Sequence, residues 1–414
     1  MELAQNPSRG TKHILMVLDA FFPFDLRVEK EGRALVDAGY RLTVVCYRNE
    51  GQSLEEIRDG IRIVRTPAVV GHAKKGITDI LRSLSGQNFT LKSLIRRELA
   101  NADAIHAHDL PVYATAYALA KGKGLPVILD MHENFPEGLL AWFQWRKKPL
   151  IRIKNELFFS YKAWLRKEKT ALNSADRVIA VVEEMRDRMV KLHGTDASKV
   201  TIVGNTESER LTEDKKGGSV MIPRSKKIVY VGSIGPHRGV DTAIEAMPYI
   251  LAEDAEVRLV VVGSGNADTL AHLQSMAEQK GVADAVRFTG QVPYDAALKH
   301  MEDALLNIIP HHSNGQNEAT VPHKLFQILL SRAPLMVSSC APLKRIVGDN
   351  DAGLVFEAGN AADFAVKAVW ALSHEEELQK MTERGMQLVK TGGYKWENDA
   401  ARLVKMYDNL FVQT

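Results

Sequence analysis

Short apolar runs alternate with longer segments along most of this chain, and in the longer segments apolar residues recur every three or four positions. In the first half, the short runs are residues 13–20, 41–47, 60–66, 104–108, 126–132 and 177–182. They are rich in β-branched residues and have the length of buried strands, whereas segment 27–40 has the helical period. Strands that alternate with helices form parallel sheets with helices on both faces. The first half therefore predicts an open α/β domain.

The alternation stops at residues 204–227, which are polar, charged and interrupted by Gly and Pro, as is typical of a linker. It then resumes with apolar runs at 227–233, 258–265, 286–292, 304–310, 334–339 and 353–356. The pattern predicts two α/β domains in tandem, each a Rossmann-like parallel sheet, facing each other across a cleft. In this architecture ligands bind at the carboxyl ends of the strands.

Composition narrows the class of protein. A chain of 414 residues that is 45% hydrophobic can bury two cores, and a net charge of +3 is too small to indicate nucleic-acid binding. Cys46 and Cys340 lie in apolar runs, which predicts buried, reduced thiols and a cytoplasmic location. The first residues lack the apolar core of a secretion signal, and no apolar run approaches the roughly 18 residues that span a bilayer. Any membrane contact is therefore expected to be peripheral.

Two segments of the second half carry basic residues at the predicted starts of helices. In "VGSIGPHRGVDTAIEAM" a glycine-containing loop leads from a strand into a helix, and Arg238 stands at the junction. In "EATVPHKLFQILLS" Lys324 occupies a first helical turn, where a cation opposes the helix dipole unless an anion lies over it. Each could also be an ordinary exposed basic side chain. Together they predict a diphosphate that is held without a metal ion.

Other motifs are less specific. The single Gly-x-Gly of "VVVGSGNAD" favours a tight turn over a nicotinamide site, and the "DND" of 349–351 favours a turn over a metal site. His132 and Glu133 follow the strand at 126–132 without the spacing of a zinc motif, so we expect His132 to hydrogen-bond a ligand. For His106 and His108 a packed, structural role is favoured.

Residues 142–169 carry nine Lys or Arg and two Glu, interleaved with seven aromatic residues. Basic and aromatic side chains together suit an anionic membrane surface. An amphipathic helix with a solvated charged face explains the segment equally well, so both interpretations stay open.

The order of these motifs resembles glycosyltransferase family 4, whose members are retaining enzymes of the GT-B fold. "YVGSIGPHRGVDTAIEAM", "VVVGSG", "FTGQVPYDAALKHMEDALLNIIP" and "PHKLFQILLSRAPLMVS" follow one another as in the family's donor-binding half. "FFPFDLRVEKEGRALVDAGYRLTVVCY" and "HAHDLP...LDMHENFPE" resemble the acceptor half of bacterial surface-polysaccharide glycosyltransferases. The resemblance implies an acceptor domain at 1–205, a nucleotide-sugar domain at 206–390, and a C-terminal helix at 391–414 that crosses back to the first domain.

The resemblance also implies roles for individual residues. It assigns catalysis to His132, near the transferred sugar, and to Arg238 and Lys324, at the donor diphosphate. It assigns donor binding to Gly232, Ser233, Gly263, Gln291, Val292, His323, Phe326 and Gln327. Acceptor-side candidates are Asp25, Arg27 and Glu133.

One departure from the family concerns its signature of two glutamates with seven residues between them. Ala319 and Gln327 stand at the corresponding places, and Glu318 is one residue out of register. Gln327 can still hydrogen-bond ribose hydroxyls but carries no charge.

The expected function is transfer of a sugar from a nucleoside-diphosphate donor to an acceptor hydroxyl, with retention and without a metal or other cofactor. The expected acceptor is a lipid-linked glycan of polysaccharide biosynthesis, reached at the inner face of the plasma membrane. Two alternatives stay open. One is a sugar-nucleotide-binding protein that has lost catalysis, and the other is an NAD-dependent sugar-nucleotide epimerase or dehydrogenase. "LDAFFPFDLRVEK", after the first strand, contains none of the glycines that an NAD-dependent enzyme needs there.

Overall fold

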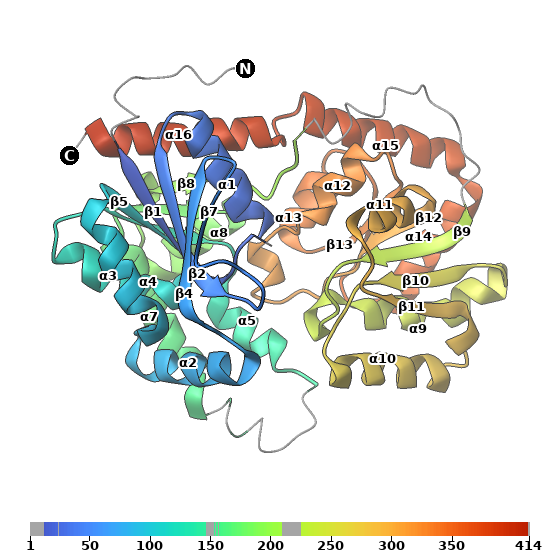
Figure 1. Cartoon of the computed structure of the whole chain (residues 1–414). Coiled ribbons are helices and arrows are strands. Elements are labelled where there is room, and N and C mark those ends of the chain that lie inside the picture. The colour runs from blue at the N-terminus through green and yellow to red at the C-terminus, as the bar shows by residue number, and fades with distance from the viewer. Residues whose placement is uncertain are drawn as a thin grey trace. The chain divides into compact units, whose positions relative to one another are not determined.

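The computed structural model describes residues 12–23, 25–145, 153, 155, 157–208 and 225–412. Most of the predicted linker at 204–227 lies outside these residues. The chain divides into two compact units. The first unit comprises Met1–Leu139, Ile153–Gly204 and Glu397–Thr414, and the second comprises Leu140–Arg152 and Asn205–Trp396. Each unit is built around its own sheet (Figure 1).

The sheet of the first unit has the strand order β3-β4-β2-β1-β5-β6-β7-β8. All neighbours are parallel except β3 and β4, which pair antiparallel. The strands are β1 (His13–Phe21), β2 (Arg41–Arg48), β3 (Glu55–Arg58), β4 (Ile61–Val69), β5 (Ala104–His108), β6 (Val127–Met131), β7 (Arg177–Ala180) and β8 (Val200–Ile202). The first six residues of β1 are buried, as a strand covered on both faces requires.

Helices cover this sheet. They are α1 (Leu26–Asp37), α2 (His72–Ser85), α3 (Phe89–Glu98), α4 (Leu110–Lys121), α5 (Phe135–Trp142), α7 (Tyr161–Ser174), α8 (Glu183–His193) and α16 (Trp396–Val412), with short turns η2 (Leu99–Asn101) and η3 (Ala197–Lys199). α4 packs against β5 and β6, and α1 packs against β2 and β4. α16 belongs to the first unit from Glu397 onward, where Tyr407 contacts His106 and Asp408 accepts a hydrogen bond from Tyr40.

The sheet of the second unit is wholly parallel in the order β11-β10-β9-β12-β13-β14. Its strands are β9 (Ser225–Val231), β10 (Arg258–Val262), β11 (Val286–Gly290), β12 (Ala304–Ile309), β13 (Leu335–Ser338) and β14 (Leu354–Phe356). Its helices are α9 (Val240–Glu253), α10 (Ala267–Gln279), α11 (Tyr294–Glu302), α12 (Lys324–Leu330), α13 (Ala341–Leu343), α14 (Ala361–Ser373) and α15 (Glu375–Lys390), with turns η5 (Pro236–Arg238), η6 (Ala283–Ala285), η7 (Asn317–Ala319) and η8 (Lys344–Gly348). The predicted class, two parallel-sheet α/β units, is confirmed.

Two glycines allow the ends of β9 and β10 to approach each other. Gly232 and Gly263 have φ angles of 141° and 138°, which residues with a side chain rarely adopt. A Cβ atom on Gly263 would lie 1.9 Å from the carbonyl oxygen of Gly232, and one on Gly232 would lie 3.2 Å from Nζ of Lys324. The glycines therefore leave open the backbone beside the predicted diphosphate lysine.

The described residues include no helix that is both long and apolar enough to cross a bilayer. Cys46 and Cys340 are free and buried, as predicted.

Candidate functional site

A buried cluster of charged and imidazole side chains lies at the carboxyl end of the first unit's sheet. Asp130 on β6 is at its centre and pairs in register with His108 on the neighbouring β5. Oδ2 of Asp130 is 2.6 Å from Nε2 of His132 and 3.1 Å from Nδ1 of His108. Its other oxygen accepts a hydrogen bond of 3.0 Å from Nη2 of Arg27, which comes from α1. Three elements therefore converge on one carboxylate.

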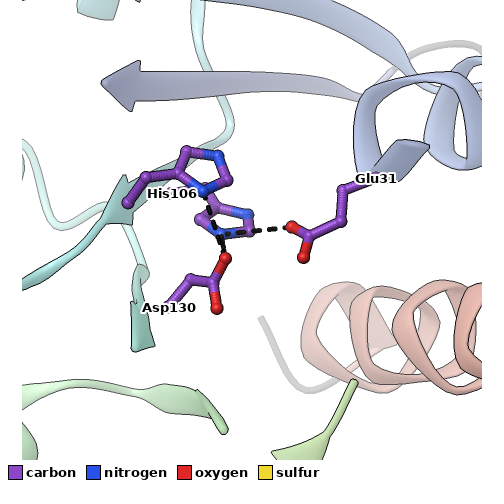
Figure 2. A group of neighbouring side chains, drawn as sticks. Glu31, His106 and Asp130 are labelled. Atoms are coloured by element: carbon purple, nitrogen blue, oxygen red, sulfur yellow. Dashed lines mark hydrogen bonds and ion pairs between the residues drawn. The ribbon is translucent and has the colours of Figure 1, made fainter. Parts of the chain in front are cut away.

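Figure 2 shows a second part of the same cluster, in which Glu31, His106 and Asp130 point toward one another. Nε2 of His106 lies 3.5 Å from Asp130 and 3.8 Å from Glu31, and all three side chains are fully buried (Figure 2). Arg27 also contacts Glu31, at 3.0 Å from Nε to Oε1. The arginine thus bridges the two buried carboxylates.

The charges of the cluster follow from these contacts. Burial opposes ionisation of Asp130, but Arg27 and His132 outweigh it and hold the pKa of that carboxyl well below its usual range. Burial likewise opposes the charged form of His132, but Asp130 and Asp109 raise its pKa to about 10. Burial lowers the pKa of His108 to about 3, with a further contribution from His106, so His108 is neutral.

His132 therefore carries a proton on both ring nitrogens at neutral pH. Its Nε2 faces Asp130, and its Nδ1 lies 3.6 Å from Oδ2 of Asp109. An imidazolium in this position donates hydrogen bonds and has no lone pair with which to accept a proton. This suits a group that binds a hydroxyl oxygen and excludes a general base in this state.

Among the described residues of the first unit, a group that could hold a metal ion is formed by Glu31, His106, His108 and Asp130, whose ligand atoms all lie within 4.8 Å of one another. Arg27 already contacts both carboxylates of this set. A divalent cation would have to share them with a guanidinium, so the charge balance favours the arginine network over a metal.

The acceptor-side candidates are placed differently from one another. Asp25 caps α1, where its carboxylate accepts hydrogen bonds from the backbone N–H groups of Arg27 and Val28. Arg27 is 9% exposed and belongs to the Asp130 network. Glu133 directly follows His132 and is half-buried. Of the three, only Arg27 contacts the cluster through the pairs described above.

The second unit holds two cations close together at the end of β9. Nζ of Lys324 lies 3.7 Å from the ring centroid of Tyr230, and Arg238 lies in η5 with Nη1 3.4 Å from Nε2 of His311. Within the described residues neither cation forms an ion pair with a carboxylate. Burial and Arg238 lower the pKa of Lys324 well below that of an ordinary lysine. An anion is what this pair lacks.

The two neighbouring histidines are neutral, so they add no charge to the pair. Burial and Arg238 lower the pKa of His237 to about 3 and that of His311 well below its usual value. α12 spans only seven residues, so the positive charge comes from the side chains of Lys324 and Arg238 more than from a helix dipole.

The other predicted donor residues fall into three groups. Gly232 and Gly263 form the close backbone approach described above, and exposed Ser233 accepts a hydrogen bond from Tyr230 through its carbonyl. Gln291 is exposed, whereas Val292 packs against a small apolar cluster of β9, β10 and β12. The third group lies on and next to α12. Phe326 is 1% exposed and stacks on Tyr394, so it supports α12 from the core. His323 and Gln327 both contact Glu207.

The positions of the two missing family glutamates are also resolved. Ala319 is buried in η7. The carboxylate of Glu318 accepts hydrogen bonds from Oγ of Ser313 and from the backbone N–H of Ala341, so it caps α13. Sequence reasoning missed Glu207 and His311, whose places beside the site depend on contacts between distant segments and leave no local signal.

Comparison with known proteins matches the two halves of the chain to two family models. "Glycosyltransferase Family 4" matches residues 27–206, and "Glycosyl transferases group 1" matches residues 212–388.

Curated relatives have low sequence identity to this chain but match it over most of its length. The chain is 23% identical over 322 residues to D-inositol 3-phosphate glycosyltransferase 2 of Catenulispora acidiphila, covering 74% of this chain and 70% of the relative. It is 23% identical over 329 residues to the phosphatidyl-myo-inositol mannosyltransferase of Mycobacterium leprae, covering 77% of each.

Solved structures share the fold across nearly the whole chain. Sucrose-phosphate synthase of Thermosynechococcus elongatus superposes with a TM-score of 0.75 at 16% identity, covering 97% of this chain and 100% of the other. Anabaena HepE, in complex with UDP and glucose, superposes with a TM-score of 0.70 at 12% identity, covering 96% and 100%.

The first prediction from this geometry concerns the proton on His132. Replacing Asp130 with Asn removes the nearest anion and is expected to lower the pKa of His132 from about 10 by about 1 to 3 pH units. The measurement is an NMR titration of protein with ¹³C-labelled histidine, in which His132→Gln assigns the resonance.

Asp37→Asn, on the exposed face of α1, is the matched control and should leave the titration unchanged. A wild-type His132 that titrates at the value of a free histidine would contradict the charge assignment.

The second prediction concerns Lys324. A bound diphosphate supplies the missing negative charge and raises the depressed pKa of Lys324, so binding should take up a proton. Between the free and bound pKa values the affinity should therefore fall as the pH rises. Calorimetry at a series of pH values from about 8 upward, where the diphosphate is already fully ionised, measures the uptake as the dependence of binding heat on the buffer's ionisation enthalpy.

Lys324→Arg keeps the charge but does not titrate, so the proton uptake should disappear in that variant. Unchanged uptake in the arginine variant would assign the proton to another group, such as His237 or His311.

Proposed function

Because the chain belongs to glycosyltransferase family 4, we propose that it transfers a sugar from a nucleoside-diphosphate donor to an acceptor hydroxyl, with retention at the anomeric carbon and without a metal ion. The observation that carries the proposal is the pair formed by Lys324 and Arg238, two cations that lack a carboxylate partner among the described residues. A leaving diphosphate gathers negative charge in the transition state, and fixed cations stabilise that charge without reorganising.

The first unit contributes the orientation of the transferred sugar. His132 is a largely buried imidazolium whose Nε2–H is held by Asp130, whereas its Nδ1 lies 3.6 Å from Asp109, beyond hydrogen-bond distance. The Nδ1–H can therefore donate to a sugar hydroxyl and fix the direction of the ring. No side chain is assigned as a nucleophile. Retention then requires attack on the same face from which the diphosphate departs, with the departing phosphate oxygen accepting the acceptor's proton.

We propose further that the acceptor is a lipid-linked glycan of polysaccharide biosynthesis, reached from the cytoplasmic side of a membrane. Two features of the first unit support a lipid surface. Ile77, Leu81 and Leu84 recur along α2 with exposed fractions of 61%, 46% and 62%. α7, which carries exposed basic residues, contacts α2 where Lys167 donates to the carbonyl of Ser83. Trp164, on α7, is buried in the core and cannot meet a membrane. We therefore assign the apolar part of the membrane contact to the exposed side chains of α2.

The names of the relatives bear on the same point. The Mycobacterium leprae relative is named for a phosphatidyl-inositol acceptor, and the Anabaena structure contains UDP and glucose. The first name is compatible with an acceptor carried by a lipid, and the second structure is compatible with a nucleotide-sugar donor.

The donor site is tested by thermal shift with UDP, GDP, ADP, dTDP and NAD, with EDTA present throughout. A ligand at about 100 times its dissociation constant adds roughly 2.7 kcal/mol to stability. One nucleoside diphosphate is expected to shift the melting temperature, and Lys324→Ala or Arg238→Ala should abolish the shift. In turnover of the matching nucleotide sugar, each alanine variant should raise the barrier by about 2–4 kcal/mol.

Lys299→Ala, an exposed lysine on α11, is the control and should retain wild-type turnover. NMR of the first-formed product should show the anomeric configuration of the donor. A shift with NAD alone would refute the proposal in favour of a nicotinamide enzyme, and diphosphate binding without turnover would favour a protein that has lost catalysis.

The lipid surface is tested by co-sedimentation with vesicles of anionic phosphatidylglycerol against vesicles of phosphatidylcholine. The double variant Leu81→Ser and Leu84→Ser should bind anionic vesicles about tenfold more weakly, because buried apolar area and charge act together at such a surface. Val366→Ser, an equally exposed residue of α14, should bind as the wild type does. Equal binding to both vesicle types by the wild type would contradict the proposal.

A further inference from the structure

A cavity of about 260 Å³ lies between α4 and α7 of the first unit. Its wall is formed by side chains of these two helices and by Gly86, the residue that ends α2. α7 contacts α4 along this wall and also contacts the end of α2 (Figure 1). The described residues that line the cavity include no member of the Asp130 cluster. The cavity is therefore a separate site that the proposed sugar transfer does not use.

The interior of the cavity is apolar, because the hydroxyl groups in its wall already have partners. The hydroxyl oxygens of Tyr113 and Ser174 lie 2.9 Å apart, and Thr170 donates to the carbonyl of Arg166 at 3.0 Å. A buried water needs several polar partners, so hydrocarbon is a better occupant here than water. A cavity of roughly 150 Å³ already accepts a benzene ring, so this one has room for a stretch of acyl chain.

The charged side chains at the cavity are basic. Arg166 is exposed, and its guanidinium makes no hydrogen bond or ion pair with a residue that the structure describes. Nζ of Lys167 donates to backbone carbonyls and lies 4.4 Å from the ring centroid of Trp164. A third cation, Lys121, lies 5.6 Å from the ring centroid of Tyr117 in the wall. No acidic side chain is among the described lining residues, so the site suits an anionic head group.

The cavity adjoins the exposed apolar face of α2. Leu84 near the end of α2 and Phe89 at the start of α3 are 62% and 54% exposed, and they flank Gly86 in the chain. Lys167 donates to the carbonyl of Ser83, so α7 contacts α2 at the same place. The apolar surface that we assign to membrane contact therefore reaches the cavity.

We propose that this cavity binds one acyl chain of an anionic phospholipid, whose phosphate faces Arg166 and Lys167. The chain fills the apolar interior, and the phosphate meets cations that lack a carboxylate partner among the described residues. A peptide segment is a poorer occupant, because its backbone N–H and C=O groups would find few partners there. The inference goes beyond the proposed sugar transfer, since it involves neither the donor nor the acceptor hydroxyl.

The test uses dodecyl phosphate, a single chain with an anionic head, below the concentration at which it forms micelles. No bilayer surface is then present, and calorimetry of the full chain should show one saturable site. Dodecyltrimethylammonium, which has the same chain and a cationic head, should bind at least about fivefold more weakly. Inorganic phosphate, which lacks the chain, should show no saturable binding at the cavity at the same concentration.

Two variants with matched controls test the cavity and its charge. Ala114→Leu fills the cavity from α4 and should weaken binding of dodecyl phosphate at least about tenfold, because a packed interior has no room for both groups. Ala118→Leu, on the exposed face of α4 one turn later, should bind as the wild type does. Arg166→Ala should weaken binding about fivefold, whereas Lys169→Ala, an exposed lysine of α7 outside the lining, should not.

The position of the bound chain is measured through Trp164, which is 2% exposed and lies in the wall of the cavity. A bromine at the end of the dodecyl chain should quench tryptophan fluorescence in the wild type, and Trp164→Phe should lose that quenching. Trp370→Phe, on α14 of the second unit, is the control and should keep it.

Three outcomes would overturn the inference. One is equal binding of dodecyl phosphate by Ala114→Leu and Ala118→Leu, and another is equal binding of the anionic and cationic chains by the wild type. The third is a wild-type dimer in sedimentation velocity that Ala114→Leu dissociates, because a second copy of the chain would then occupy the cavity. The donor proposal is tested without any lipid by the panel of nucleoside diphosphates, so failure of one does not imply failure of the other.

Discussion

The charge of the second unit's site depends on two neighbouring cations, Lys324 and Arg238, which have no carboxylate partner in the part of the chain that the structure describes. Burial disfavours the ammonium of Lys324, the nearby guanidinium of Arg238 adds repulsion, and together they lower the pKa of Lys324. The structure around them avoids adding to this repulsion, since His237 and His311 stay neutral and glycines stand at the ends of β9 and β10. An anion that reaches this place removes the repulsion and gains two charged partners at once.

In the first unit, unlike the second, the buried charges are paired with one another. Asp130 is surrounded by Arg27, His108 and His132, and every charge there has a partner before any substrate arrives. The network fixes His132 as a donor, whereas the pair in the second unit stays unbalanced until a ligand binds. This difference matches the two roles proposed above, orientation of the sugar by the first unit and stabilisation of the diphosphate charge by the second.

The sequence predicted most strands because buried parallel strands appear as short apolar runs, as β1, β2 and β10 do. It missed β3 and β8, whose residues are largely exposed or half-buried and carry no such run. Lys324 and Arg238 could be named because each stands in a local motif. The bond from His132 to Asp130 and the contact from Gln327 to Glu207 could not, because both depend on how the chain folds.

The position of Glu207 bears on the loss of the glutamate at position 327. A carboxylate from a distant part of the chain can lie beside a motif position that carries none of its own, as Glu207 does beside Gln327. Once Glu207 occupies that place, repulsion disfavours a second carboxylate at position 327 and an amide becomes the better neighbour. α12 then carries Lys324 and Gln327 on a single short helix, with Phe326 packed in the core behind them. A shift of that helix would move Lys324 and Gln327 together, so both of these proposed donor-binding residues depend on one element.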